Sequence, residues 1–320
     1  MDSVGIVDIG STNFRYAAAT PTGDFLTDVT TEPTRPHELV AQLGGAIERL
    51  RDAATVDAVA IAVPGLVDSG CVRRFDTADG DVIDRIEVAT PLRERYGLPV
   101  VLENDCTASA LGEWYFGARE DQECLLQLTV GTGIGGGVVE RGQALRGEDG
   151  GAGEFGLIPV APDSILESTG VTGAWEAFCS GRGIPSYVRH RFRADGMWEE
   201  NAASEFRETL AAGDEFDAPA VFEAAAAGDP FVQGCLDRVS RYNAVGIAAL
   251  CNAYNPGLVT LGGGVARNNT DWFLEGVDRY LEEYLFVDRP AIRESPLGDD
   301  LGLYGALGVA LDRGETELNR

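Results

Sequence analysis

A strand–turn–strand pattern with small residues at the turn occurs twice in this chain, and it constrains the fold more than any other feature. Residues 3–9 are mostly apolar and lead into a turn at Gly10, and residues 15–19 are expected to form the returning strand. Residues 125–130 lead in the same way into Gly131-Thr132-Gly133, and a second strand leaves that turn. Because 320 residues is long for one compact core, the pattern predicts two α/β lobes of related architecture.

The lobes are expected at residues 1–118 and 119–302, and the second is expected to carry a helical insertion. A final helix at about 303–314 is expected to pack back on the first lobe. The insertion falls in residues 172–254, an Ala-rich and mainly helical stretch whose last helix stops before Asn255-Pro256.

Hydrophobic periodicity places the other main elements. Leu39, Leu43, Ile47 and Leu50 share one face and predict a helix over residues 37–53. Three buried strands are predicted by short apolar runs, at residues 57–63, 100–102 and 259–261. A helix is predicted directly after the second of these strands, at residues 107–116.

The net charge of −27 excludes several classes of partner. A surface this acidic repels nucleic acid and anionic membranes. All 25 basic residues are arginine, and the acidic residues are spread along the whole chain. This composition favours a halophilic protein from an archaeon that keeps salt in its cytoplasm. Acidic drift in a GC-rich genome is the alternative.

The start of the chain and its cysteines predict a cytoplasmic protein. No basic segment followed by an apolar run marks a secretory signal, and no run approaches the ~18 apolar residues that span a bilayer. The six cysteines form no Cys-x-x-Cys pair and there are only two histidines, so no clustered zinc ligands are visible. Buried free thiols are the expected state.

The first turn contains Asp8 followed by Gly10-Ser11-Thr12-Asn13. Small residues let backbone N–H groups surround a phosphate, and an Asp at the end of the preceding strand can hold Mg²⁺ directly or through water. An ordinary hairpin turn is the alternative.

The second turn extends from Gly131 to Gly137 and matches the G-x-G-x-x-G pattern of dinucleotide sites. That interpretation requires a helix after the glycines, whereas Val138-Val139-Glu140 resembles a strand, so a phosphate-binding hairpin is favoured. In a third loop, Gly263 and Gly264 allow a flat ligand to lie against bare backbone. A plain strand-to-helix turn is the alternative for this loop.

Four polar residues are candidates for substrate chemistry. Asp105, after Asn104 at the end of a strand, can take a proton from a hydroxyl while the amide orients neighbouring hydroxyls. A helix N-cap at Asp105 is the alternative. Glu154, in a glycine-rich loop, and Glu176, in a helix, can bind sugar hydroxyls, although each alone is more often a solvated charge.

The order of these segments resembles the ROK family of sugar kinases and repressors over roughly residues 4–312. The turn from Gly10 to Arg15 is similar to the phosphate turn of hexokinases, and residues 62–68 are similar to the family's sugar-side loop. The resemblance implies a two-lobed, ribonuclease-H-like ATPase fold of the actin type, with the active site in the interlobe cleft. It implies an ATP-dependent kinase acting on a sugar hydroxyl, the 6-OH of glucose or a related hexose being favoured. N-acetylmannosamine or fructose as substrate, and a non-catalytic sugar-binding regulator, are the alternatives.

The resemblance also assigns roles to individual residues. It carries Mg²⁺ binding onto Asp8 and base catalysis onto Asp105. Sugar contacts fall on Gly65, Asn104, Asp105, Glu154 and Glu176. Contacts to ATP fall on Gly10, Ser11, Thr12, Asn13, Gly131, Thr132, Gly133, Gly263 and Gly264. Partners other than the sugar and ATP are not expected, apart from further copies of the chain in a homodimer or higher homo-oligomer.

Three positions depart from the family pattern. Leu157 stands where a histidine binds both zinc and sugar, and the segment Ser168–Gly173 lacks the cysteines of the family's zinc motif. We therefore expect no stoichiometric zinc. Ser11 replaces the usual glycine of the phosphate turn. These changes leave the phosphoryl-transfer residues in place but leave the specificity for glucose open.

Three other functions match parts of the sequence. Repressors of the family carry a helix-turn-helix ahead of the kinase-like part, and the first turn at residue 8 together with the acidic surface disfavours this. A catalytically dead sugar-binding protein is disfavoured by the presence of Asp8 and Asp105. A nicotinamide dehydrogenase is distinguished by whether a helix or a strand follows Gly137.

Overall fold

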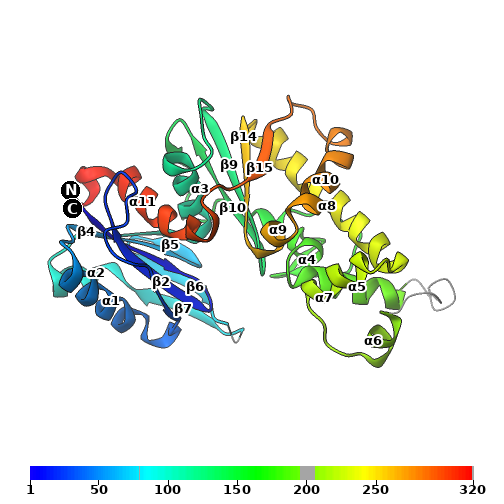
Figure 1. Ribbon diagram of the computed structural model, residues 1–320, viewed down its shortest axis with the longest axis horizontal. Helices are drawn as coiled ribbons and strands as arrows, with labels where there is room; N and C mark the ends of the chain where they lie inside the picture. The colour runs from blue at the N-terminus through cyan, green and yellow to red at the C-terminus, as the bar shows by residue number, and fades with distance from the viewer. Residues whose placement is uncertain (79, 195–205, 319–320) are drawn as a thin grey trace. The chain divides into compact units, whose positions relative to one another are not determined.

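The computed structural model describes residues 1–78, 80–194 and 206–318, which form two compact units (Figure 1). The first unit comprises residues 1–127, 136–153 and 295–320, and the second comprises residues 128–135 and 154–294. The chain therefore leaves the first unit and returns to it near its C-terminal end. The lobe bounds expected from the sequence remain a prediction.

The first unit is built on a five-stranded sheet with the order β3-β2-β1-β4-β8. In that order the strands are Thr30–Pro33, Asn13–Ala19, Val4–Ile9, Ala58–Val63 and Val100–Asn104. β1 and β2 form an antiparallel hairpin that closes at the pair Ile9↔Phe14, and β4 runs parallel to both β1 and β8. The strands predicted at residues 3–9, 57–63 and 100–102 are confirmed.

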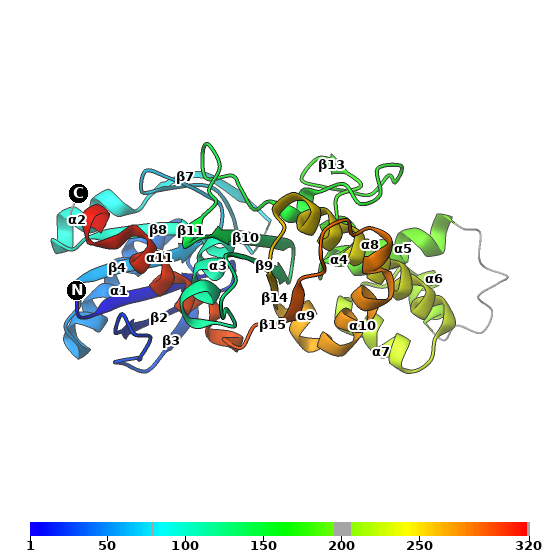
Figure 2. The same cartoon turned by 90° about the horizontal axis from the view of Figure 1, so that it is seen from above.

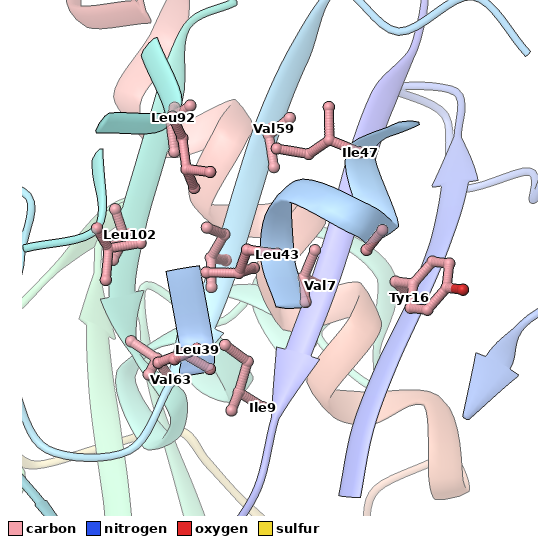
Figure 3. Packing of buried hydrophobic residues seen from close by; sticks show 14 of the residues in the cluster. Val7, Ile9, Tyr16, Leu39, Leu43, Ile47, Val59, Val63, Leu92 and Leu102 are labelled. Atoms are coloured by element: carbon pink, nitrogen blue, oxygen red, sulfur yellow. The ribbon is translucent and has the colours of Figure 1, made fainter. Parts of the chain in front are cut away.

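Helix α1, Leu39–Ala53, covers one face of this sheet and confirms the predicted amphipathic helix. Figure 3 shows Leu39, Leu43 and Ile47 of the helix lying over the strand residues Val7 and Val59. All five are fully or almost fully buried. Because burying one such side chain contributes roughly 1.5–3 kcal/mol, this stripe fixes the helix on the sheet.

Helix α11, Leu301–Leu318, packs on β1 and β4 and on helix α3, Asp105–Phe116. Side chains alternate along a strand, so Ala58, Ala60 and Ala62 of β4 face away from α1 and leave room for a closely packed helix. The two helices meet backbone to backbone: a Cβ placed on Gly305 would lie 2.8 Å from the Ala108 carbonyl carbon. The final helix predicted near 303–314 is therefore present.

A smaller sheet in the first unit has no counterpart in the sequence predictions. Its strands have the order β5-β6-β7 and the bounds Leu66–Asp68, Cys71–Asp76 and Val82–Glu87, and helix α2, Ala89–Tyr96, follows them. Charged residues interrupt the apolar alternation in these short strands, which explains why periodicity does not reveal them. Gly65 precedes β5 with φ +95°, and a Cβ there would lie 2.6 Å from the Arg73 carbonyl oxygen.

The second sheet has the order β11-β10-β9-β14-β15, and β9 and β10 contribute residues to both units. In that order the strands are Gln143–Ala144, Ile134–Glu140, Cys124–Val130, Leu258–Gly262 and Ala291–Glu294. The strand predicted at residues 259–261 is confirmed by β14, and the predicted strand–turn–strand by β9 and β10.

Helices make up most of the rest of the second unit (Figure 2). Their bounds are α4 Glu176–Cys179, α5 Gly183–Ala194, α6 Arg207–Ala212, α7 Ala218–Ala226, α8 Pro230–Tyr254, α9 Gly264–Asn268 and α10 Thr270–Tyr280. α8 packs on α10 and ends at Asn255 with φ 48°, which confirms the predicted helix stop. Residues 195–205 of the predicted helical stretch lie outside the described residues. No helix in the described part of the chain combines the length and apolarity needed to cross a bilayer.

The acidic charge lies at the surface. Among the described residues, Glu103, Glu113 and Asp229 are buried acidic residues, and the side chain of Asp312 is only 8% exposed. The 52 acidic side chains outnumber the 25 arginines, so the repulsion among the excess negative charges is screened by ions in the solvent.

We expect the melting temperature to rise by about 10 °C or more between dilute buffer and 2 M KCl, and then to level off. The Debye length falls from about 30 Å at 0.01 M to about 3 Å at 1 M salt, which removes most of the repulsion. A series with sucrose, which strengthens apolar burial without screening charge, is the control. Equal melting temperatures in dilute buffer and in molar KCl would show that the surface charge is not a salt adaptation.

Candidate functional site

The turn between β1 and β2 is held by its own backbone and by one threonine. The Gly10 N–H donates to the Asn13 carbonyl oxygen at 2.7 Å. Thr34 braces the turn twice, with its N–H donating to Thr12 O at 2.9 Å and its hydroxyl donating to Gly10 O at 2.8 Å. Ser11 is partly exposed and Thr12 and Asn13 are exposed, so the turn has a surface free for a ligand. Thr34 could not be identified from the sequence, because its partners Gly10 and Thr12 lie in a turn more than 20 positions earlier in the chain.

Asp8 is the last residue but one of β1 and lies on the face of the sheet that α11 covers. Gly302, in the first turn of α11, makes room for it: a Cβ at Gly302 would lie 2.4 Å from each carboxylate oxygen. Burial raises the pKa of Asp8 to about 6, the negative charge of Asp105 adds to this rise, and Arg15 opposes it. Arg15 is itself paired with Asp300, with 2.6 Å between its Nη2 and the Asp300 Oδ1.

The residues around Asp8 fit a magnesium ion whose coordination is completed by a bound ligand. Asp8 and Asp105 raise the energy of each other's ionised form, and a divalent cation would relieve that repulsion. Mg²⁺ in phosphoryl-transfer sites is held by one or two carboxylates together with phosphates and water. The described residues contain no group of three or more His, Cys, Asp or Glu arranged to hold a metal by themselves. The donor set therefore fits a phosphate-bound cation and not a closed protein cage.

Asp105 and Asn104 divide the two roles that the sequence left open at Asp105. The Asn104 side chain is the N-cap of α3, and its Oδ1 accepts from the N–H groups of Cys106 at 3.0 Å and Thr107 at 3.1 Å. Its Nδ2 donates to Gly65 O at 3.1 Å, which fastens the Gly65 loop to the start of α3. Asp105 occupies the first helical position, and burial raises the pKa of its carboxyl group. The interpretation of Asp105 as the N-cap is therefore wrong.

A buried network of ion pairs includes Glu103, the residue that precedes Asn104 and Asp105. Arg146 places its Nε 2.6 Å from Glu103 Oε2 and its Nη2 2.5 Å from Asp312 Oδ2. The Glu103 and Asp312 side chains are only 4% and 8% exposed. Arg313 approaches Glu103 Oε2 at 3.3 Å. Because Glu103 immediately precedes Asn104, the network fixes the end of β8 from which α3 begins.

The raised pKa of Asp8 leads to a prediction on stability. Between about pH 4 and pH 6 the folded protein holds a proton on Asp8 that the unfolded chain has lost, so stability falls as pH rises through this window. Above pH 6 the ionised group costs at most about 3 kcal/mol. Asp8→Asn is therefore expected to raise the free energy of unfolding of the ligand-free protein by about 1–3 kcal/mol at pH 8 and by little at pH 4.

Urea unfolding at the two pH values in constant molar KCl measures this difference. Asp121→Asn, which removes an exposed carboxylate, is the matched control and should show no such dependence on pH. A variant at Asp8 that is less stable than wild type at pH 8 would contradict the prediction.

In the second unit, the glycine turn Gly131–Gly133 joins β9 to β10. The Gly131 N–H donates to Gly133 O at 2.9 Å, and β10 begins immediately afterwards at Ile134. A strand and not a helix thus contains Gly137, which removes the structural requirement for a dinucleotide site. The predicted hairpin is confirmed, and the binding of phosphate by its turn stays a prediction.

Helix α4 and the residues after it form hydrogen bonds with this turn and with the start of β10. Glu176 Oε2 accepts the Ile134 N–H at 3.0 Å. Gly181 N–H donates to Gly131 O at 2.7 Å, and Arg182 N–H donates to Thr132 O at 3.3 Å. The third loop lies beside the same turn: Gly263 has φ +83°, and a Cβ there would lie 2.5 Å from Val130 O. Gly264 begins α9, which confirms the predicted strand-to-loop-to-helix order.

Glu154 and the segment that departs from the family pattern also belong to the second unit. Glu154 is exposed, and its carbonyl oxygen accepts the Leu157 N–H at 3.1 Å. Residues 167–172 form a short hairpin of β12, Glu167–Ser168, and β13, Val171–Thr172. Ser168 Oγ donates to Glu176 Oε1 at 2.5 Å, a contact that the sequence analysis missed.

The structure thus gathers the sequence candidates into two groups. The first unit brings Asp8 near Asp105, and joins Gly65 to Asn104. The second unit brings the glycine turn at Gly131–Gly133 beside Gly263 and Glu176.

Comparison with known proteins assigns the chain to a family. The model of the ROK family matches residues 4–313, almost the span over which the sequence resembles it. The chain belongs to the ROK family. A glucokinase of Thermotoga maritima is 30% identical to this ROK protein over 314 residues, which cover 96% of each chain.

Two solved structures are similar over nearly their full length. The ROK hexokinase from Thermus thermophilus has a TM-score of 0.78 and 31% identity, covering 97% of this chain and 98% of its own. A ROK family glucokinase from Streptomyces griseus, solved in complex with glucose and AMPPNP, has a TM-score of 0.73 and 29% identity, covering 97% and 99%. This ROK protein therefore has the α/β, actin-like ATPase fold that the resemblance implied.

Proposed function

We propose that this ROK protein is an ATP-dependent sugar kinase that transfers the γ-phosphoryl group to a hexose hydroxyl. The similarity to glucokinases along nearly the whole chain supports the reaction class, and a relative that binds glucose and AMPPNP supports the two ligands. The observation that carries the proposal is the Asp105 carboxylate. Asn104 caps the helix, and Asp105 Oδ1 accepts only one of the same N–H groups that Asn104 Oδ1 already accepts, that of Cys106, at 2.9 Å.

The chemical step needs a base for one proton. As the sugar oxygen bonds to the γ-phosphorus, its proton passes to the Asp105 carboxylate, and the bond between the γ-phosphorus and the bridging oxygen breaks to release ADP. Burial raises the pKa of Asp105, which makes its ionised form a better proton acceptor than an exposed Asp. The Asn104 contacts to the backbone of α3 hold that carboxylate in one place.

The remaining groups bind and orient the substrates. We assign sugar contacts to Gly65, Asn104, Glu154 and Glu176. Phosphate contacts are assigned to the turn from Gly10 to Asn13, the turn Gly131–Gly133, and the pair Gly263 and Gly264. Asp8 would hold Mg²⁺, which neutralises phosphate charge when bound. Because Leu157 and residues 168–173 offer no His or Cys, we propose that no zinc takes part.

The 6-OH of glucose or of a related hexose is the proposed acceptor. The test is an assay in 2 M KCl with ATP, Mg²⁺ and a panel of glucose, mannose, fructose, N-acetylglucosamine and N-acetylmannosamine, with the sugar phosphate identified by mass spectrometry and NMR. Formation of glucose 6-phosphate with the highest kcat/KM is expected. Preference for another sugar would overturn the acceptor, and the absence of any sugar phosphate from folded protein would overturn the kinase.

A further inference from the structure

The Glu176 carboxylate lies where three segments of the second unit meet. Oε2 accepts the Ile134 N–H at 3.0 Å, and Oε1 accepts the Ser168 hydroxyl at 2.5 Å. Two glycines make space for it: a Cβ on Gly133 would lie 2.9 Å from Oε2, and a Cβ on Gly156 would lie 2.7 Å from it. The two glycines therefore leave room for this carboxylate, whereas a carboxylate in solvent needs no such space.

The contact with Ile134 acts on the glycine turn itself. Ile134 is 5% exposed and follows Gly133 directly, so its N–H group has a fixed partner at the point where the turn ends and β10 begins. A hydrogen bond to an ionised acceptor is about twice as strong as one to a neutral acceptor. The N–H groups of Gly181 and Arg182 hold two carbonyl groups of the same turn. The short segment from residue 176 to residue 182 thus forms three hydrogen bonds with the turn and with the residue that follows it.

We propose that Glu176 positions the phosphate-binding turn Gly131–Gly133 as well as contacting the sugar, and that Ser168 positions Glu176. The inference rests on the proposed kinase function, because it takes this turn as part of the nucleotide site. One carboxylate would then serve both substrates: a sugar hydroxyl and the Ile134 N–H share it. Loss of the carboxylate weakens nucleotide binding even when no sugar is present.

Two substitutions at Glu176 separate the effect of its hydrogen bonds to Ile134 and Ser168 from the effect of its negative charge. Glutamine keeps an oxygen for the Ile134 N–H and an NH₂ group that donates to Ser168 Oγ, whereas alanine keeps neither. We expect Glu176→Ala to raise the Kd of AMPPNP, measured by calorimetry without sugar, by about tenfold or more, which corresponds to ~1.4 kcal/mol. Glu176→Gln should stay within about threefold of wild type.

Variants of the hairpin test the role of Ser168. Ser168→Ala is expected to raise the Kd of AMPPNP by about three- to tenfold, and Ser168→Thr, which keeps the hydroxyl, should restore it. Glu167→Ala removes an exposed charge from the same hairpin and is the matched control, with no change expected. Ser168→Ala also serves if Glu176→Ala does not fold.

Hydrogen exchange separates this inference from the proposed function. The Ile134 amide of ligand-free protein should exchange at least about tenfold faster in Glu176→Ala and in Ser168→Ala than in wild type. Unchanged exchange, or unchanged AMPPNP affinity in a folded Glu176→Ala, would overturn the inference whatever the kinase activity. A further outcome is that exchange rises in the variants while wild-type protein binds no AMPPNP and makes no sugar phosphate. In that case the positioning of the turn by Glu176 is supported, but the proposed kinase function and the assignment of the turn to the nucleotide site are both wrong.

Discussion

Asp105→Asn is expected to lower kcat by roughly 10²–10⁴-fold while the Kd of the sugar stays within about tenfold of wild type. The amide has nearly the shape of the carboxylate and can still bond to a hydroxyl, but it cannot accept the proton as the oxygen attacks. The loss therefore falls on the transition state and not on the bound substrate. Initial rates with ATP and the preferred sugar measure kcat, and calorimetry measures sugar binding.

Asp121→Asn is the matched control for that experiment, because Asp121 is an exposed carboxylate of the same unit. Its kcat should equal that of wild type. If Asp105→Asn turned over at the wild-type rate, another group would have to be the base, and Asp105 would lose its assigned role.

Arg146→Ala is expected to lower the free energy of unfolding by about 3–5 kcal/mol. The substitution leaves Glu103 and Asp312 in place with side chains that are 4% and 8% exposed, and Arg313 remains 3.3 Å from Glu103 Oε2. The two buried carboxylates would then lack the arginine that they share. Urea unfolding in constant molar KCl gives the difference, because salt at that level already screens the surface charge.

Arg35→Ala is the control for the ion network. Arg35 pairs with Glu38 at 3.2 Å, but the two side chains are 52% and 65% exposed, so its loss should cost less than about 1 kcal/mol. Similar losses for the two variants would show that burial does not distinguish the Arg146 network. Because Glu103 precedes Asn104, we also expect Arg146→Ala to lower kcat in the protein that remains folded.

Short-range patterns predicted the elements whose signal lies within one segment. The spacing of Leu39, Leu43 and Ile47 gave α1, and the residues after Gly137 distinguished a strand from a helix. The division of roles between Asn104 and Asp105 was beyond the sequence, because both residue types cap helices well and a shift of one position decides between them. Only the backbone position of α3 shows that Asn104 is the cap.

Contacts between distant segments were not predictable in the same way. Arg146 bonds to an aspartate 166 positions away, and Glu176 bonds to an N–H group 42 positions away. Periodicity and local motifs report on neighbours within a few turns, so they contain no signal for such pairs. The strong rise in the Asp8 pKa likewise depends on burial by α11, which a single sequence does not reveal.

The return of α11 to the first unit sets the order of events during synthesis. Residues 1–127 leave the ribosome well before residue 295, and at about 5–20 residues per second the 167 residues between them take roughly 8–33 s to make. Throughout this interval the nascent chain lacks the helix that covers β1 and β4, so their alanine-rich face stays open to water and to other chains. The first unit can reach its final packing only after α11 has emerged, even though most of its residues are made first.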